Sequence, residues 1–219
     1  PKERPWVPRF FSTCGGEKVT LNQEIQLLGK PEVYLQTFLD AMTETLKIKF
    51  HECWKYAQEL SRVDWLMEQV PDPLEKNETH ADPRSPAQLT LLCSFIQYVI
   101  DCEQAISSGK LKQFNQAQRK DISDLVNITI NPKLTKNERQ RVMCMITMDA
   151  HNRDIVAKLI REEVDRVDHF LWQSQLKPRR DPENDNLPTY TVLNGFFPYG
   201  FEYIGNDGRL VVTPLTDRI

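Results

Sequence analysis

The stretch SPAQLTLLCSFIQYVI, residues 85–100, decides how the rest of the chain folds. Ser85 suits the N-cap of a helix, Pro86 suits its first position, and Gln88 is placed to complete a capping box. The residues that follow are apolar on nearly every side, which is typical of a helix buried among others. Gly109 is well placed to end this helix. The sequence therefore predicts a central helix around which the other elements pack.

Further helices are predicted on both sides of the central one. Between Pro31 and Leu60, apolar residues recur at three- and four-residue steps, with polar residues on the opposite face. The inward positions of this stripe are Leu35, Phe38, Leu39, Met42, Leu46, Phe50, Cys53, Trp54, Ala57 and Leu60. Such a stripe more often covers the helix's own core than a partner. Another helix is predicted from Lys110 to about Val126. A capping box, Thr135-Lys136-Asn137-Glu138, then opens one bent helix or two helices.

Short β elements and loops complete the predicted pattern. A hairpin is expected near the N-terminus, with its turn at 14–18, and residues 71–86 are expected to form an exposed proline-rich loop. The expected C-terminal order is a short helix turning into a strand (165–176), a loop (177–188), two strands (189–194 and 197–203) and a closing hairpin through Asn206-Asp207-Gly208 to Leu210-Val211-Val212. The predicted fold class is mainly α, an elongated helical bundle with a small antiparallel β element at its C-terminal end.

Composition argues against several classes of function. The net charge is −3, so no basic field indicates nucleic acid or an anionic membrane surface as a partner. No apolar run approaches the roughly 20 residues that span a bilayer. Four of the five cysteines lie in apolar helical patterns, where free, buried thiols are expected, as in a reducing compartment. The five are Cys14, Cys53, Cys93, Cys102 and Cys144.

The sequence contains no recognisable catalytic or metal-binding motif. A phosphate-binding Walker A loop needs spaced glycines followed by Gly-Lys and a hydroxyl residue, and neither Gly29-Lys30-Pro31 nor Gly109-Lys110-Leu111 meets that pattern. The histidines and cysteines lack the spacing of metal ligands. His151 could form a catalytic pair with an aspartate of its motif, Asp149 or Asp154, but no nucleophile motif accompanies it. Polar contacts between helix segments are therefore the favoured interpretation. Trp172 is interpreted as core, with a docking patch as the alternative.

Four stretches resemble motifs of dynein heavy chains, in the same order and at similar spacing. They are DAHNRDIV (149–156), FLWQSQL (170–176), YGFEYIGN (199–206) and GRLVVTPLTDR (208–218). The last one resembles the segment through which a dynein heavy chain passes from its linker into its first AAA+ module. The resemblance covers Asp149 to Arg218, and a weaker helical similarity extends back to about Phe11.

The resemblance implies a mechanical role. Residues 1–180 would be the C-terminal part of a helical linker, and residues 181–219 a β-rich neck leading into the first AAA+ module. In dynein the linker is a lever that bends and straightens as this module binds, hydrolyses and releases nucleotide, which drives the microtubule power stroke. The site residues that the resemblance implies lie on the adenine side of the nucleotide in the intact motor: Leu210, Val211, Val212, Pro214 and Leu215.

The resemblance also implies where the chemistry and the partners lie. ATP or ADP with Mg would bind to the whole motor rather than to this chain alone, and the Walker A motif is expected after Ile219. The chain itself is therefore not expected to be an enzyme. The implied partners are the AAA+ ring of the same heavy chain, microtubules and other dynein subunits, in the cytoplasm and cytoskeleton. The sequence of residues 172–176 resembles axonemal heavy chains more than cytoplasmic ones, which favours a location in a cilium or flagellum. The rival hypothesis is a free-standing helical protein-interaction module.

Overall fold

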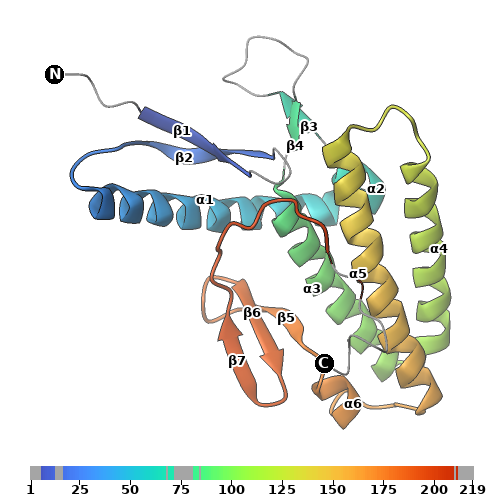
Figure 1. The fold of residues 1–219 in the computed structure, drawn as a ribbon. Helices are drawn as coiled ribbons and strands as arrows, with labels where there is room; N and C mark the ends of the chain where they lie inside the picture. The colour runs from blue at the N-terminus through green and yellow to red at the C-terminus, as the bar shows by residue number, and fades with distance from the viewer. Residues whose placement is uncertain are drawn as a thin grey trace. The chain divides into compact units, whose positions relative to one another are not determined.

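The chain is mainly helical with small antiparallel β elements, which confirms the predicted class (Figure 1). The computed structural model describes residues 6–12, 17–67, 69–71, 81–83, 85–209 and 211, without the side chains of 69–71 and 81–83. The chain forms two compact units. The first comprises residues 1–93 and 200–207, and the second comprises 94–199 and 208–219. The predicted division at residue 180, between linker and neck, stays a prediction.

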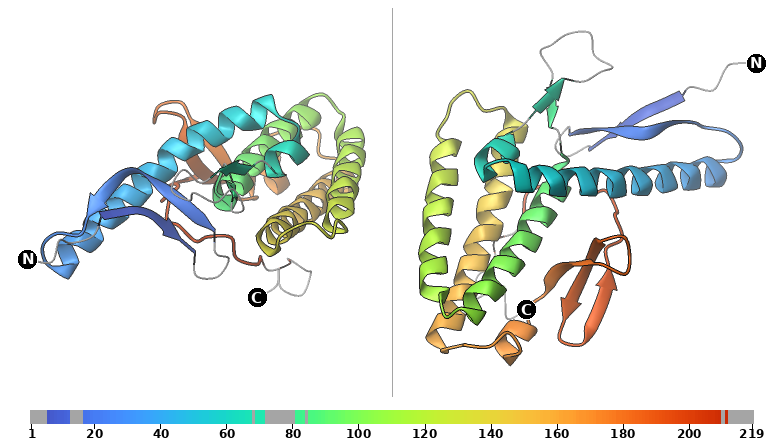
Figure 2. Two further views of the ribbon diagram at one scale, coloured as in Figure 1. Left: turned by 90° about the horizontal axis from the view of Figure 1, so that it is seen from above. Right: turned by 180° about the vertical axis from the view of Figure 1, so that it is seen from behind.

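The first unit begins with the expected hairpin, in which β1 (Trp6–Phe11) pairs antiparallel with β2 (Lys18–Gln26). Residues 14–16 of the predicted turn, like residue 13 before them, lie outside the described part of the chain. The hairpin runs along the helix α1 (Pro31–Glu59), as two views show (Figures 1 and 2). A small core of Phe10, Val19 and Leu21 packs against apolar side chains of α1. The hairpin therefore forms a β layer that packs on one side of α1.

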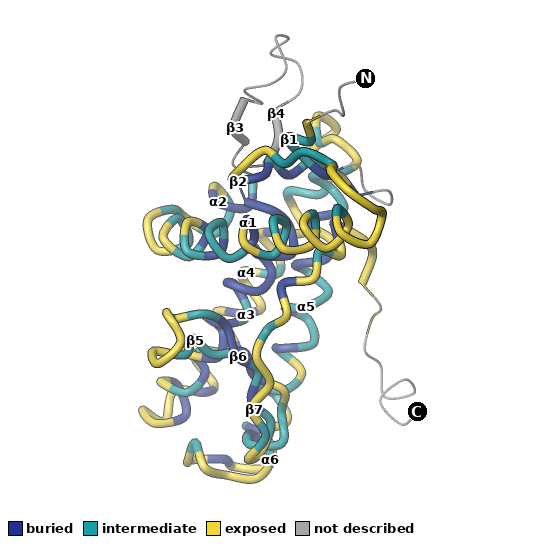
Figure 3. Tube along the Cα trace, turned by 90° about the vertical axis from the view of Figure 1, so that its left-hand side faces the viewer, coloured by how far each residue is buried: buried dark blue, intermediate teal, exposed yellow. Residues whose placement is uncertain are grey.

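Only part of the apolar stripe on α1 faces inward. Leu46, Phe50 and Cys53 are fully buried, but Leu35 and Leu39 are 53% and 54% exposed. The prediction that these two leucines face inward is wrong. The hairpin packs on the neighbouring face of the helix, through residues such as Phe38 and Met42, and the first turns of α1 are largely exposed (Figure 3).

After α1, a short helix α2 (Arg62–Met67) leads to the predicted proline-rich loop. The ends of that region pair as two short antiparallel strands, β3 (Gln69–Pro71) and β4 (Ala81–Pro83). Residues 72–80 and 84 lie outside the described part of the chain. The prediction of an exposed loop over 71–86 is therefore wrong at Pro71 and at Ala81–Pro83, which belong to these strands.

The central helix, α3 (Ala87–Ser107), begins and ends where its sequence predicts. Gly109 has a φ of +67°, its N–H bonds to the carbonyl of Ile106 at 3.1 Å, and the Lys110 N–H bonds to the carbonyl of Ala105 at 2.8 Å. This pair of hydrogen bonds, with glycine at positive φ, is a common way for a helix to end. By length and composition α3 could cross a membrane, contrary to the expectation above, but 56% of its apolar window is buried inside the structure. A buried core helix has the same composition.

In the second unit, the later turns of α3 pack with two long helices, α4 (Leu111–Thr129) and α5 (Lys136–Arg161), which lie side by side (Figure 2). α5 is a single helix, which settles the alternative left open by its sequence. Its predicted capping box is present: Thr135 accepts from the Glu138 N–H at 3.2 Å, and Glu138 accepts from the Thr135 N–H at 2.7 Å. The core that these elements share consists of the buried residues Tyr98, Val99, Cys102, Ala105, Ile106, Leu111, Val156, Leu159, Val164 and Trp172.

A short helix, α6 (Phe170–Gln173), leads into a three-stranded antiparallel sheet ordered β5 (Lys177–Asp181), β6 (Leu187–Val192), β7 (Gly195–Pro198). The predicted loop at 177–188 is wrong because its first five residues pair with β6. The predicted strand at 197–203 ends at Pro198. None of the described residues from 199 to 209 belongs to a strand, so the closing hairpin is wrong over that range.

The cysteines of the described chain agree with the sequence analysis. Cys53, Cys93, Cys102 and Cys144 are all buried, and none of these four described thiols forms a disulfide. Burial raises the pKa of the Cys102 thiol to about 12, and the neighbouring carboxylates Glu103 and Asp101 act in the same direction. Cys14 lies outside the described residues.

Candidate functional site: attachment of the C-terminal segment

Among the residues described after β7 (199–209 and 211), none belongs to a helix or strand, yet several of those in 200–207 are buried in the first unit. We call residues 201–206 the strap. Phe201 is 2% exposed and Asn206 is 5% exposed. An irregular segment has no neighbouring strand for its backbone groups, so side chains or water must satisfy them. Contacts with the rest of the first unit therefore have to hold the strap in place.

A buried carboxylate forms the first attachment. Glu17 follows the hairpin turn and is 3% exposed. Its Oε1 accepts a hydrogen bond from the Ala87 N–H at 2.8 Å, and its Oε2 accepts one from the Tyr203 hydroxyl at 3.0 Å. The first turn of a helix leaves N–H groups without helical partners and carries partial positive charge, which stabilises a carboxylate there. Glu17 thus joins the hairpin, the start of α3 and the strap through one side chain.

The side chain of Gln88 forms the second attachment. Its Nε2 donates to the carbonyl of Glu202 at 2.7 Å, and its Oε1 accepts from the Ile204 N–H at 3.0 Å. The amide therefore takes the place that a neighbouring strand would occupy. These bonds also explain why the predicted hairpin does not form here, since they use backbone groups that a strand pair would need. The sequence predicts a capping role for Gln88, and no local signal indicates its bonds to the strap. We call Glu17, Gln88 and Tyr203 the strap joint.

Aromatic packing and backbone geometry fit the strap closely to the unit. The Phe201 ring packs edge-on against Phe50 with centroids 6.2 Å apart, and Tyr203 packs against Phe10 at 4.8 Å. Phe201 has a φ of +52° and Gly205 a φ of +69°. A Cβ at Gly205 would lie 2.2 Å from Ser12 Oγ, so a larger residue does not fit without movement. The positive φ of Phe201 is uncommon for a bulky residue and marks local strain.

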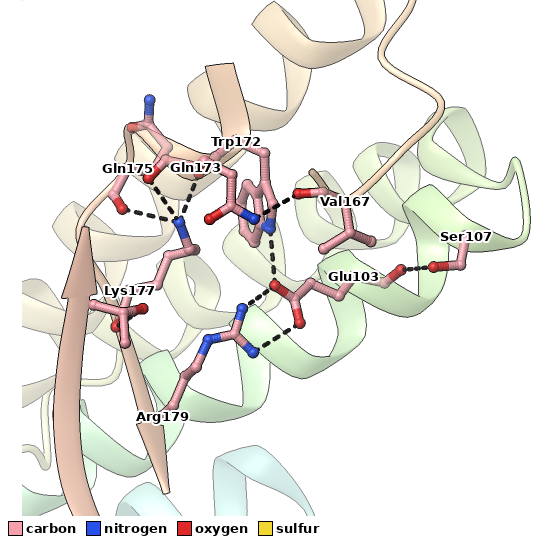
Figure 4. Close-up of polar contacts among 9 residues, drawn as sticks. Glu103, Ser107, Val167, Trp172, Gln173, Gln175, Lys177 and Arg179 are labelled. Carbon is pink, nitrogen blue, oxygen red and sulfur yellow. Dashed lines mark hydrogen bonds and ion pairs between the residues drawn. The ribbon is translucent and has the colours of Figure 1, made fainter. Parts of the chain in front are cut away.

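A second polar cluster attaches the sheet to α3 within the second unit (Figure 4). Glu103 Oε1 accepts from the Trp172 Nε1–H at 2.9 Å, and the two carboxylate oxygens form a two-pronged ion pair with Arg179. Trp172 is completely buried, which confirms its interpretation as core. Phe170, beside it, is 67% exposed. We call Glu103, Trp172, Lys177 and Arg179 the sheet anchor.

Lys177 supplies an unusual part of the sheet anchor because its ammonium group is buried. Its Nζ donates to the carbonyls of Trp172, Gln173 and Gln175 at 2.8, 3.1 and 3.1 Å, and lies 5.3 Å from the centre of the Trp172 ring (Figure 4). The pKa of Lys177 is lowered to about 8, mainly by burial and also by the nearby Arg179 cation, while the Glu103 carboxylate opposes the shift. The three carbonyls belong to the end of α6 and the turn after it, so the lysine fixes the start of the sheet.

The polar motif at 149–154 joins helices, as its structural interpretation predicts. The carbonyl of Asn152 accepts from the Tyr98 hydroxyl at 3.3 Å, and the carbonyl of Arg153 accepts from Asn115 Nδ2 at 3.2 Å. Asp154 pairs with Arg153 at 2.7 Å. The motif thus connects α5 with α3 and α4.

The nucleotide-contacting residues implied by the resemblance are largely beyond what the structure describes. Leu210, Val212, Pro214 and Leu215 lie outside the described residues, and Val211 is 62% exposed. Their contact with adenine stays a prediction. Across the described residues, no group of three or more acidic, histidine or cysteine side chains is arranged to hold a metal ion.

The described fold is that of a mainly helical segment whose C-terminal part is attached by buried polar clusters. No family model matches the chain. It is 31% identical over 209 residues to a ciliary dynein beta chain of Tripneustes gratilla, covering 93% of this chain and 4% of that protein. It is 38% identical over 225 residues to the flagellar outer-arm dynein alpha chain of Chlamydomonas reinhardtii, covering all of this chain and 4% of that protein. It is 31% identical over 208 residues to human dynein axonemal heavy chain 9, covering 92% of this chain and 4% of that protein.

The chain is homologous to a segment of the dynein heavy chains. The similarity extends over nearly its whole length, and the relatives carry ciliary, flagellar or axonemal names. The chain spans about 4% of the length of the curated relatives it matches. This agrees with the family resemblance found in the sequence motifs.

Proposed function

We propose that the chain is a mechanical linker segment of a dynein heavy chain, coupling ATP-driven changes in the AAA+ ring to microtubule-based force generation. The observation that carries this proposal is the homology to dynein heavy chains over 92–100% of the chain. A lever needs stiff elements and a fixed attachment to the part that senses nucleotide. The long helices α1 and α5, of 29 and 26 residues, meet the first need. The strap joint supports the second, because it fixes the start of the C-terminal segment to the first unit.

The proposal assigns ATP hydrolysis to the whole heavy chain and not to this segment. The 219 residues contain no Walker A motif. ATP or ADP with Mg would bind in the AAA+ ring, where Leu210, Val211, Val212, Pro214 and Leu215 would lie on the adenine side. The partners would be that ring, microtubules and other dynein subunits. The names of the relatives favour work in a cilium or flagellum.

The test uses the intact heavy chain. Helices α4 and α5 are replaced by a flexible Gly/Ser linker, and two quantities are compared with those of the unmodified motor: the affinity for ATP and the velocity at which the motor moves microtubules. The linker function predicts that velocity falls far more than ATP affinity, because the ring remains while the lever loses stiffness. An unchanged velocity of microtubule gliding would contradict the proposal.

A free-standing helical interaction module is the second candidate. The exposed apolar side chains Leu193, Phe196 and Phe197, around the turn from β6 to β7, favour a contact with another protein. The two candidates differ in the coding sequence after Ile219. The linker function predicts a Walker A motif within roughly 30 residues of it, and its absence would favour the interaction module.

A further inference from the structure

The strap is held by bonds that join three parts of the first unit far apart in the sequence. The bond from Ala87 to Glu17 spans 70 residues, those from Gln88 to the strap span 114 and 116, and that from Tyr203 to Glu17 spans 186. The hairpin, the start of α3 and the strap thus meet at three side chains. Moving the strap away would break several of these bonds together.

The cost of breaking them is high because the groups are buried. Glu17 would stay inside the unit with one hydrogen bond fewer, and Gln88 would lose both of its hydrogen bonds to the strap. A buried polar group without its partner is far less stable than one in water. The strap also holds Phe201 at a positive φ, a strain that persists only where surrounding contacts enforce it. A segment acting only as a loose spacer would need none of these features.

We propose that Glu17, Gln88 and Tyr203 are positioning residues of force transmission, forming the joint through which load passes between the helices of the first unit and the C-terminal segment. This inference rests on the linker function proposed above. The joint holds the strap rigid, so that a displacement at one end appears at the other. Without it the strap would stretch or swing, and part of the displacement would be lost.

The experiment places substitutions in the intact heavy chain. Tyr203→Phe removes one hydroxyl and keeps the ring on Phe10, while Gln88→Met keeps the length of the side chain and removes both bonds to the strap. Tyr190→Phe is the matched control, because the Tyr190 hydroxyl takes part in no hydrogen bond among the described residues while its ring is packed against Tyr199. Glu17→Gln and Glu17→Ala form a rescue pair, because glutamine keeps an acceptor for the Ala87 N–H and alanine does not.

Two glycine variants separate backbone strain from the fit of the strap. Gly109→Ala and Gly205→Ala both place alanine at a φ near +68°, namely +67° and +69°. The new Cβ meets nothing within 4 Å at Gly109 and meets Ser12 Oγ at 2.2 Å at Gly205. Both variants place a side chain at a positive φ of nearly the same size, and only the Cβ at Gly205 meets a neighbouring side chain of the first unit.

The readouts are the distance that microtubules move per ATP hydrolysed and the hydrogen-exchange rate of the peptide covering 199–209. Tyr203→Phe and Gln88→Met are expected to raise exchange about tenfold, the effect of losing a buried hydrogen bond. They are also expected to shorten the distance per ATP while ATP affinity stays constant. Glu17→Gln should retain more of that distance than Glu17→Ala. Tyr190→Phe and Gly109→Ala should match the unmodified motor.

The outcomes separate the joint from the linker function. If exchange rises but the distance per ATP is unchanged, the strap joint is a structural contact only, and the inference is overturned. If exchange does not change, the joint does not hold the strap, which also overturns it. If the replacement of α4 and α5 leaves gliding unchanged, the linker function itself fails, whatever the strap variants do.

Discussion

The sheet anchor allows a prediction whose size follows from its contacts. Glu103→Ala removes the acceptor of the buried Trp172 indole N–H and the partner of Arg179. An unsatisfied buried donor costs about 1–3 kcal/mol. The lost ion pair adds only about 0.5 kcal/mol, because the Arg179 side chain is 39% exposed and solvent screens its charge. We therefore expect Glu103→Ala to lower the free energy of unfolding by about 1.5–3.5 kcal/mol.

Two companion variants divide this loss between its sources. Glu103→Gln keeps an oxygen that can accept from Trp172 and removes the charge, so it should cost about 1 kcal/mol. Arg179→Met leaves the bond between Glu103 and Trp172 intact and removes only the ion pair, so it should cost about 0.5 kcal/mol. The measurement is urea unfolding of the 219-residue chain, followed through the NMR signal of the Trp172 indole N–H, which reports on the second unit. The reasoning is refuted if Glu103→Ala costs no more than Glu103→Gln.

Three further predictions concern the same chain. Thr135→Ala removes one half of the capping box of α5 and should lower the free energy of unfolding by about 1 kcal/mol, measured by urea unfolding; an unchanged value would contradict the capping role. For Lys177 the folded pKa, about 8, lies below the usual 10.5 of the unfolded chain, so the unfolded state binds more protons between these values. Unfolding from pH 8 to 10.5 should therefore show stability rising with pH relative to Lys177→Met, and a falling difference would refute the shift. Burial raises the pKa of Cys102 from 9.0 to about 12, so its contribution is present below pH 9 and lost as pH rises toward 12; Cys102→Ala should make unfolding less sensitive to alkali, and equal sensitivity would contradict this.

Local signals in the sequence were sufficient for the helices. The capping box at Thr135 and the glycine stop at Gly109 act within a few residues of their positions, so a short window contains the whole cause. The apolar stripe of α1 was harder, because periodicity shows which residues share a face but not how far a neighbour covers it. Leu35 and Leu39 are on the stripe and remain exposed.

The sheet and the strap were mispredicted for a different reason. The stretch from Lys177 to Asp181 is charged and contains a proline, which is typical of a solvated loop. Lys177 is nevertheless buried, because its ammonium group donates hydrogen bonds to backbone carbonyls of the residues just before it, such as Trp172. The hydrogen bond between Tyr203 and Glu17 spans 186 residues, and the sequence near either residue gives no signal that predicts it. The candidate site therefore depends on long-range pairing, which local propensity does not encode. The family motifs at 199–206 marked the right segment without revealing how it is held.

The linker function is tested most directly by watching the segment move. Lys112, exposed on α4, is replaced by cysteine in the intact heavy chain and labelled with a donor dye, and an acceptor dye is attached to the AAA+ ring. Energy transfer between the two dyes is then measured without nucleotide, with ATP and with ADP. A lever that bends and straightens predicts a change in transfer between these states. Transfer that is the same in all three states would contradict the account.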